Sequence, residues 1–193
     1  ELAIKAKKLS KKNILIAGSL PAQNDTYEVD KRDKNIIEKN FFDQAKIISP
    51  YIDFFYLDVL SSGREIEIAL NIIQNLKKTV LVGLHIKKNG KLPSGETLSE
   101  LAEKCKSKKW LGIVAACVSP EIIENSIDEI KELKIPFGFK VNLWKTEEPI
   151  PVHKFASPID KIGTNPVESM GTRNEYTDVR FLEFSKNMMD HGA

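Results

Sequence analysis

Five short, almost continuously apolar segments alternate with stretches of helical periodicity, and this alternation limits the chain to very few folds. Runs of this kind are typical of strands whose two faces are both covered. The segments span residues 14–20, 54–60, 79–86, 111–118 and 136–143. Between them, apolar side chains recur at helical spacing, as in Ile36, Ile37, Phe41, Ala45 and Ile48. Strand and helix in turn predict parallel βα units and therefore an α/β fold.

Two helix starts carry recognisable signals. Ser62, followed by Gly63 and then Arg64 and Glu65, is a candidate N-cap, and Pro120 stands at the first position of another expected helix. Helical periodicity returns over residues 178–191. The stretch from 144 to about 176 has no periodicity and several prolines, so we expect a long functional loop there.

Composition narrows the classes of partner. The chain has 193 residues, enough for one domain, and 29 Lys and Arg against 27 Asp and Glu give a formal charge of +2. This balance gives no reason to expect a nucleic-acid or membrane-surface partner. The two cysteines cannot form a disulfide framework, so a reducing, cytoplasmic compartment is expected. The apolar runs are too short to cross a bilayer, and the first residue is Glu1 rather than Met, which suggests part of a longer protein.

In parallel α/β folds the site lies at the carboxyl ends of the strands. That rule selects six residues of this chain. They are Gly18 and Ser19 after the first run, Asp58 in the second, His85 in the third, Cys117 in the fourth and Asn142 in the fifth. No glycine-rich phosphate loop is present, and the three histidines share no metal-ligand spacing.

Asp58 and Cys117 each allow two interpretations. An isolated carboxylate in an apolar strand is costly to bury, so Asp58 either serves function or caps the following loop. Cys117 is either a ligand or a small core residue. Cys105, on a lysine-rich helix without a partner motif, is expected to be incidental.

Several segments, taken in order, resemble the homocysteine S-methyltransferase family. Residues 14–21 (ILIAGSLP) resemble the family's Ala-Gly-Ser-Leu segment, and residues 52–58 (IDFFYLD) resemble the strand that ends in its substrate-binding Glu. Residues 91–98 (KLPSGETL) resemble its Gly-Glu-Ser-Leu pattern, and residues 112–120 (GIVAACVSP) its Gly-x-Asn-Cys-x-x-Pro signature. Residues 136–142 (PFGFKVN) resemble the strand that ends in the family's Asn, and residues 171–174 (GTRN) fit more loosely.

The resemblance implies a (βα)8 barrel of which about five βα units are present. Residues 1–193 then form one homocysteine-binding domain, apparently truncated at both ends. The implied activity is methyl transfer from a donor to the homocysteine thiol through a zinc-activated thiolate. Cys117 would be one of three zinc cysteines, Asp58 would hold the substrate ammonium, and Asn142 with the Gly18–Ser19 backbone would shape the pocket. The other two zinc cysteines are not in the sequence, Ala116 replaces the signature Asn, and Asp58 is one methylene shorter than the usual Glu.

Two alternatives remain open at this point. One is a non-catalytic α/β protein that keeps a small-molecule pocket or an assembly role without zinc. The other is an open, doubly wound sheet with unrelated ligand chemistry. An incomplete barrel would expose sheet edges, so self-association into a homo-oligomer is also expected.

Overall fold

The fold is built on one parallel sheet. The computed structural model describes residues 1–146, 148–151, 153 and 171–193. Its strands are β1 (Ala17–Pro21), β2 (Phe54–Leu60), β3 (Val80–Leu84), β4 (Gly112–Val118) and β5 (Phe137–Val141). Neighbouring strands are parallel and follow the order β1-β2-β3-β4-β5, as the alternating pattern predicts. A doubly wound sheet would place its strands out of sequential order, so that alternative is excluded.

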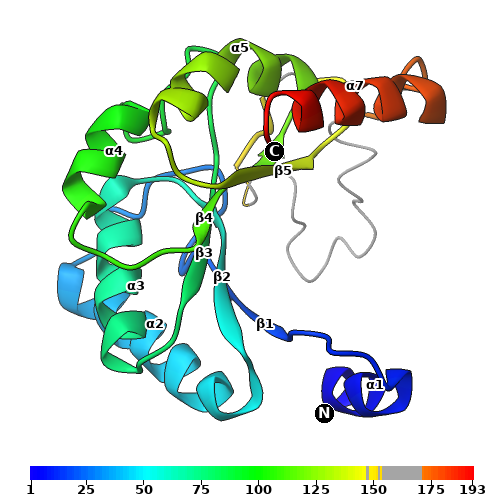
Figure 1. Cartoon of the computed structure of the whole chain (residues 1–193). Helices are drawn as coiled ribbons and strands as arrows, with labels where there is room; N and C mark the ends of the chain where they lie inside the picture. The colour runs from blue at the N-terminus through cyan, green and yellow to red at the C-terminus, as the bar shows by residue number, and fades with distance from the viewer. Residues whose placement is uncertain (147, 152, 154–170) are drawn as a thin grey trace, which may run out of the picture.

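Helices cover one face of this sheet (Figure 1). Helices α2 (Lys34–Ile48), α3 (Gly63–Asn75), α4 (Leu98–Cys105) and α5 (Pro120–Glu132) lie on this face, with a short 3-10 turn η1 (Ser49–Tyr51) after α2. Helix α1 (Leu2–Ser10) lies apart from them, before β1, and helix α7 (Asp178–Asp190) lies near the C-terminus. Ser62 accepts a hydrogen bond from the Glu65 amide and Pro120 opens α5, so both predicted helix starts are confirmed. Helix α7 reaches the sheet beside β5, where Phe184 packs edge-on against Phe139 at 5.2 Å between ring centroids.

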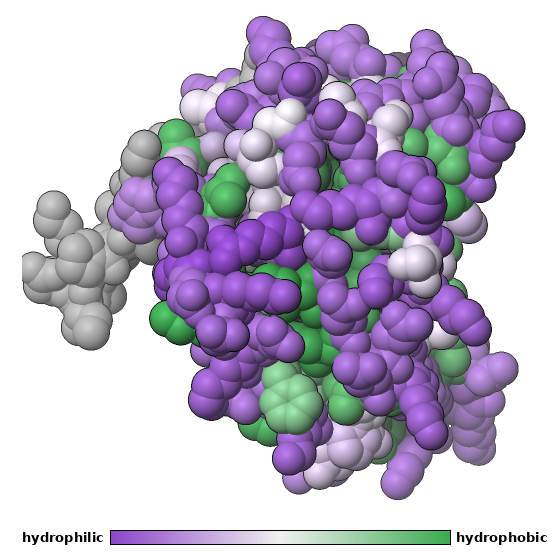
Figure 2. Space-filling model, turned by 90° about the vertical axis from the view of Figure 1, so that its left-hand side faces the viewer, coloured by the Kyte–Doolittle hydropathy of each residue, from purple (hydrophilic) through white to green (hydrophobic). Residues whose placement is uncertain are grey.

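The hydrophobic core lies between the sheet and helices α2 to α5. Phe41 of α2, Phe55 of β2 and Ile66 of α3 are fully buried there. The opposite, outward side of these helices is mainly hydrophilic, with hydrophobic side chains visible between them (Figure 2). Burial of apolar area against the helices is therefore the main force that holds the sheet.

The other face, here called the inner face, is only partly covered in the described structure. Burial alternates along β1 and β2, and the strand register places Ser19, Tyr56 and Leu81 side by side on this face. Ser19 is exposed and Tyr56 is half-buried. The prediction that both faces would be buried throughout is therefore wrong for β1 and β2. In each of these strands only the side chains on the helix-covered face are fully buried.

The first strand is shorter than its apolar run. Pairing with β2 begins at Ala17, and Leu15 is 64% exposed. The Asp53 carboxylate accepts the Ile16 amide at 2.7 Å and thereby ends the regular ladder. Helix α1, just before it, carries no buried residue, so it has no apolar stripe from which periodicity could predict it.

The predicted long loop falls mostly outside the described residues. At its two ends, Trp144 and Thr172 form an isolated antiparallel bridge. No helix in the described ranges is long and apolar enough to cross a lipid bilayer.

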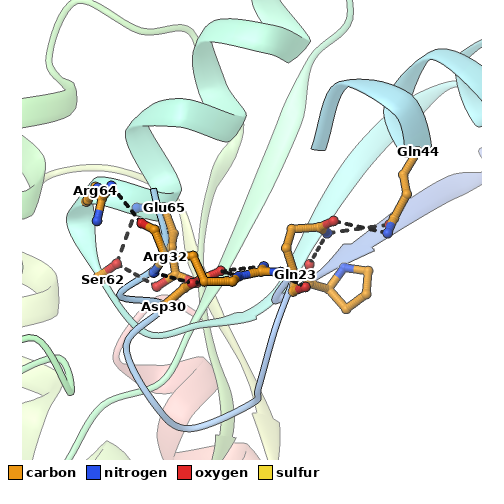
Figure 3. A network of polar contacts seen from close by, with 8 residues as sticks. Gln23, Asp30, Arg32, Gln44, Ser62, Arg64 and Glu65 are labelled. Atoms are coloured by element: carbon orange, nitrogen blue, oxygen red, sulfur yellow. Dashed lines mark hydrogen bonds and ion pairs between the residues drawn. The ribbon is translucent and has the colours of Figure 1, made fainter. Parts of the chain in front are cut away.

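A polar network fastens the loop between β1 and α2 to the start of α3 (Figure 3). Asp30, only 1% exposed, forms a two-pronged ion pair with the Arg32 guanidinium, the shortest distance being 2.7 Å. Burial alone would raise the pKa of Asp30, but the hydrogen bonds from Arg32 outweigh it and the pKa is lowered. Arg64 of α3 donates to the Arg32 carbonyl at 3.1 Å, which ties the loop to the helix.

We expect Arg32→Met to destabilise the fold by about 3 kcal/mol, because it leaves the buried Asp30 carboxylate without its partner. The loss should shrink in acid. A carboxyl group whose pKa is lower in the folded state than in the unfolded state stabilises the fold at pH values above the unfolded-state pKa, and this contribution disappears as the carboxylate protonates. Urea unfolding of both proteins measures the difference. Lys39→Met, which breaks an exposed pair with Asp43, is the control and should cost less than about 1 kcal/mol. Equal costs for the two variants would contradict the network's role.

Glu65 provides a second test with the opposite pH dependence. Its side chain is fully buried and accepts the Ser62 hydroxyl at 2.5 Å, and burial raises its pKa despite that hydrogen bond. A carboxyl group whose pKa is raised in the folded state destabilises the fold as the pH rises above its pKa in the unfolded state. Glu65→Gln should therefore increase the free energy of unfolding at pH 7, and the gain should vanish near pH 3. The exposed Glu38→Gln should show no such pH-dependent gain in the same urea titrations, and a loss of stability in Glu65→Gln at pH 7 would refute the argument.

Candidate functional site

Two β-bulges shape the carboxyl end of the sheet. The register of β2 shifts between Leu57 and Leu60, and that of β4 shifts between Ala116 and Val118. At these points Val59 and Cys117 take left-handed backbone conformations, with φ of 58° and 54°. Such bulges redirect side chains and are common beside active sites. The two best candidates from the sequence, Asp58 and Cys117, thus both lie at interruptions of the ladder.

Asp58 is paired inside the protein. The Lys140 ammonium, from β5, lies 2.8 Å from Oδ1 and 3.1 Å from Oδ2 of Asp58. The Asp58 side chain is 26% exposed, so it is neither fully buried nor isolated as the apolar run suggested. The same ammonium lies 5.9 Å from the centre of the Tyr56 ring. Burial, and next the Asp58 charge, raise the pKa of Tyr56.

Cys117 lies against Tyr27, which the loop fastened by Asp30 and Arg32 brings over the end of β4. Burial and then the Cys117 thiol raise the pKa of Tyr27, whose own backbone is left-handed with φ of 71°. The Tyr27 ring meets the His85 imidazole edge-on at 5.1 Å between centroids.

His85 is a core histidine. It is 2% exposed, and burial lowers its pKa to about 4, so it is neutral at physiological pH. Its Nδ1 makes no hydrogen bond in the described part of the chain. His85 therefore contributes a neutral, rigid wall beside Cys117.

Asn142 fixes the backbone of the bulge at Cys117. Its side-chain amide donates to the Cys117 carbonyl at 2.5 Å, its backbone amide donates to the Val118 carbonyl at 3.1 Å, and its side-chain oxygen accepts the Trp144 amide at 3.3 Å. Both ends of the Asn142 side chain are thus engaged by the chain itself. Asn142 positions Cys117 in this structure.

Gly18 and Ser19 lie on opposite faces of β1. A Cβ at Gly18 would stand 2.5 Å from the Ile52 side chain, so the glycine permits close packing on the helix side. Ser19 is on the inner face and pairs in register with Tyr56, the neighbour of Asp58. Ser19 therefore faces the side of the sheet that holds Asp58, whereas Gly18 faces away from it.

Two other family-like segments support the fold. Glu96 accepts the Gly63 amide at 2.7 Å and thereby caps the start of α3. Arg173 grips the Glu121 carboxylate of α5 with two hydrogen bonds of 2.6 and 2.7 Å. These contacts explain both segments as structural ties between neighbouring βα units.

The described residues do not assemble a zinc site around Cys117. In the described ranges, the only group of three potential ligands that lie close together comprises Asp25, Glu28 and His153, on the loops. Cys105 is buried in α4, where burial raises its pKa to about 11, as expected for an incidental core thiol. Protein zinc sites need three or four protein ligands, and Cys117 brings one thiol. Cys117 alone therefore does not fit a zinc ion.

The fold and the site together define an α/β protein of parallel βα units, consistent with a partial TIM-barrel-like domain whose polar groups gather at the strand ends. The family model of homocysteine S-methyltransferase matches residues 1–168. The chain therefore belongs to the homocysteine S-methyltransferase family.

One solved relative supports the same fold. It is the homocysteine methyltransferase MmuM from Escherichia coli in its apo form, with a TM-score of 0.61 and 14% identity over 73% of this chain and 54% of that chain. The chain thus spans about half the length of this relative, and at such identity the likeness shows the fold alone. No curated protein matches the chain significantly.

Lys140 and Tyr27 are site residues that the sequence analysis missed. Lys140 is the only charged residue of β5, an unusual position in an apolar strand that matches Asp58 in β2. That pairing of opposite charges on two strands was an available signal. Tyr27 lies in an irregular loop, where no periodicity indicates the direction of a side chain.

We predict that Cys117 holds no zinc in the purified 193-residue chain, because one thiolate cannot hold the ion. Elemental analysis after dialysis against zinc-free buffer measures the content, with Cys117→Ala as the comparison. The two proteins should have the same zinc content. Stoichiometric zinc that disappears in Cys117→Ala would reveal a site that the described residues do not show.

Proposed function

We propose that this chain binds homocysteine at the carboxyl end of the sheet, as the substrate-binding part of a homocysteine methyltransferase. The observation that carries the proposal is the convergence of a carboxylate and a thiol from different strands. Asp58 and Cys117 both lie at the bulges that interrupt β2 and β4 at the same end of the parallel sheet, and the charges of both act on Tyr27 and Tyr56. A carboxylate suits the ammonium of an amino acid, and the Cys117 end suits its sulfur.

The reaction proposed is displacement at a methyl carbon. The homocysteine thiol loses its proton, and the thiolate sulfur forms a bond to the methyl carbon of a sulfonium, ammonium or folate donor. The bond from that carbon to the donor atom breaks, and its electron pair stays with the donor. Because free thiols have a pKa of about 8.5, only a small fraction is ionised at neutral pH. The residues of this chain contribute by holding the amino acid so that its sulfur faces the donor in line.

Zinc remains part of the proposal only for a more complete site. A bound zinc ion would deprotonate a coordinated thiol, and Cys117 would supply one thiolate ligand. The described residues form no group of three potential ligands that includes Cys117, so the roles assigned here to Asp58 and Asn142 do not depend on the metal. Asp58 would bind the substrate and Asn142 would fix the Cys117 backbone.

A non-catalytic binding protein is the second candidate, because the described residues place Cys117 in no group of three potential metal ligands. The two candidates differ in turnover, whereas both include binding. Incubating the chain with homocysteine, zinc and each class of methyl donor, followed by mass spectrometry for methionine, separates them. Methionine formation that depends on the chain supports the enzyme, and homocysteine binding without methionine supports the binding protein.

We predict that Asp58→Asn weakens homocysteine binding at least tenfold. The substitution nearly keeps the shape of the side chain, while loss of one partner of a partly buried ion pair typically costs about 2–5 kcal/mol. The melting temperature should change little, because the released Lys140 ammonium is already 46% exposed and can be hydrated. Calorimetric titration at matched pH measures the affinity.

Asp43→Asn is the matched control, since Asp43 is an exposed ion-paired carboxylate on α2, on the far side of the sheet. It should leave the dissociation constant unchanged. An unchanged constant in Asp58→Asn, together with a large fall in melting temperature, would show that Asp58 has a structural role only.

A further inference from the structure

Lys140 occupies the place on Asp58 that the proposed function reserves for the substrate. Its ammonium makes two contacts with the carboxylate, at 2.8 and 3.1 Å, and reaches them from a strand three positions away in the sheet. A substrate ammonium has the same charge and hydrogen-bonding capacity. The lysine therefore stands in for the ligand group in the free protein.

Small residues on the intervening strands leave room for this crossing. Ala116 of β4 is the register partner of Lys140, and Gly83 of β3 is next to the Tyr56 side chain on the same face. A Cβ at Gly83 would lie 2.5 Å from the Tyr56 hydroxyl. No large side chain of β3 or β4 therefore stands at Gly83 or Ala116, between Asp58 and Lys140. The two charged groups meet across this part of the inner face, with the Lys140 ammonium over the Tyr56 ring.

The pair is able to open. The Lys140 side chain is 46% exposed and that of Asp58 is 26% exposed. Ion pairs with this degree of solvent contact contribute little net stability, because water solvates the separated charges. The long aliphatic part of Lys140 allows its ammonium to move while its backbone stays in β5.

We propose that Lys140 is a specificity residue that receives the carboxylate of the substrate when the substrate ammonium replaces it on Asp58. The ligand class is therefore free α-amino acids that carry both charges. In this exchange each charged group changes its partner and none is left unpaired, which avoids the cost of an uncompensated charge. The inference rests on the proposed function, since it names how the same site recognises its substrate.

Three thiols test this exchange by calorimetry on the 193-residue chain. Homocysteine carries both charges, 3-aminopropanethiol lacks the carboxylate, and 4-mercaptobutanoate lacks the ammonium. The unaltered chain should bind homocysteine at least tenfold more tightly than either analogue. In Lys140→Met, homocysteine binding should fall about tenfold, while 3-aminopropanethiol should bind as tightly as before or more tightly, because it no longer competes with the lysine.

Lys140→Arg and Lys104→Met are the matched variants. Lys140→Arg keeps the cation and should retain most of the preference for homocysteine. Lys104 pairs with Glu96 at 3.2 Å with similar exposure but away from Asp58, so Lys104→Met should change no affinity. Melting temperatures show whether each variant is folded.

The outcomes separate this inference from the proposed function. If Lys140→Met weakens the binding of homocysteine and of 3-aminopropanethiol equally, or leaves homocysteine binding unchanged, the role of Lys140 is overturned even if methyl transfer is observed. The predicted ligand preferences without methyl transfer would support Lys140 and leave the binding-protein alternative. If the unaltered chain binds none of the three thiols, both the inference and the proposed substrate are wrong.

Discussion

The structure depends on the requirement that a parallel sheet be covered by apolar side chains. Helices α2 to α5 meet this requirement on one face, where residues such as Phe41 and Ile66 are completely buried. The inner face is different because polar groups stand among its apolar ones. Ser19, Tyr56, Asp58 and Lys140 lie there with partial solvent contact. The side chains that stabilise the fold therefore lie mainly on the helix-covered face. The groups suited to ligand recognition lie on the face that the helices leave open.

Local departures from ideal strand geometry then place these groups. The bulge at Cys117 adds one residue to β4, so that Val118 returns to the helix-packed core. Asn142 holds the bulge from the neighbouring strand, through hydrogen bonds to two successive carbonyls. The loop after β1 is held independently by Asp30 and Arg32 (Figure 3). This loop carries Tyr27 to Cys117. Two separate supports thus converge on one small region, as expected where side-chain positions matter for binding.

The sequence predicted the repetitive part of this architecture well. Strand runs and capped helices are local patterns, and the parallel order follows from their alternation, so five strands and the starts of α3 and α5 were predictable. Helix α1 was not, because none of its residues is buried and it has no apolar stripe. The candidate residues at strand ends were also predictable by position, but their contacts were not. Asn142 was expected to shape a pocket, and in the structure both ends of its side chain bond to the backbone.

Asp58 shows most clearly why the position of a site residue can be predicted from the sequence while its contacts cannot. The burial argument correctly states that a carboxylate in an apolar strand needs compensation. It does not say what supplies the compensation, and the sequence analysis considered only a ligand or the following loop. The actual partner, Lys140, is 82 residues away in the sequence and reaches Asp58 from β5 across small residues such as Gly83 and Ala116. An internal cation changes the energetics of recognition: a ligand must compete with Lys140 for the carboxylate, and a ligand with its own anionic group offsets that competition by pairing with the displaced lysine. The same pair that satisfies Asp58 in the free protein thus favours zwitterions over simple amines.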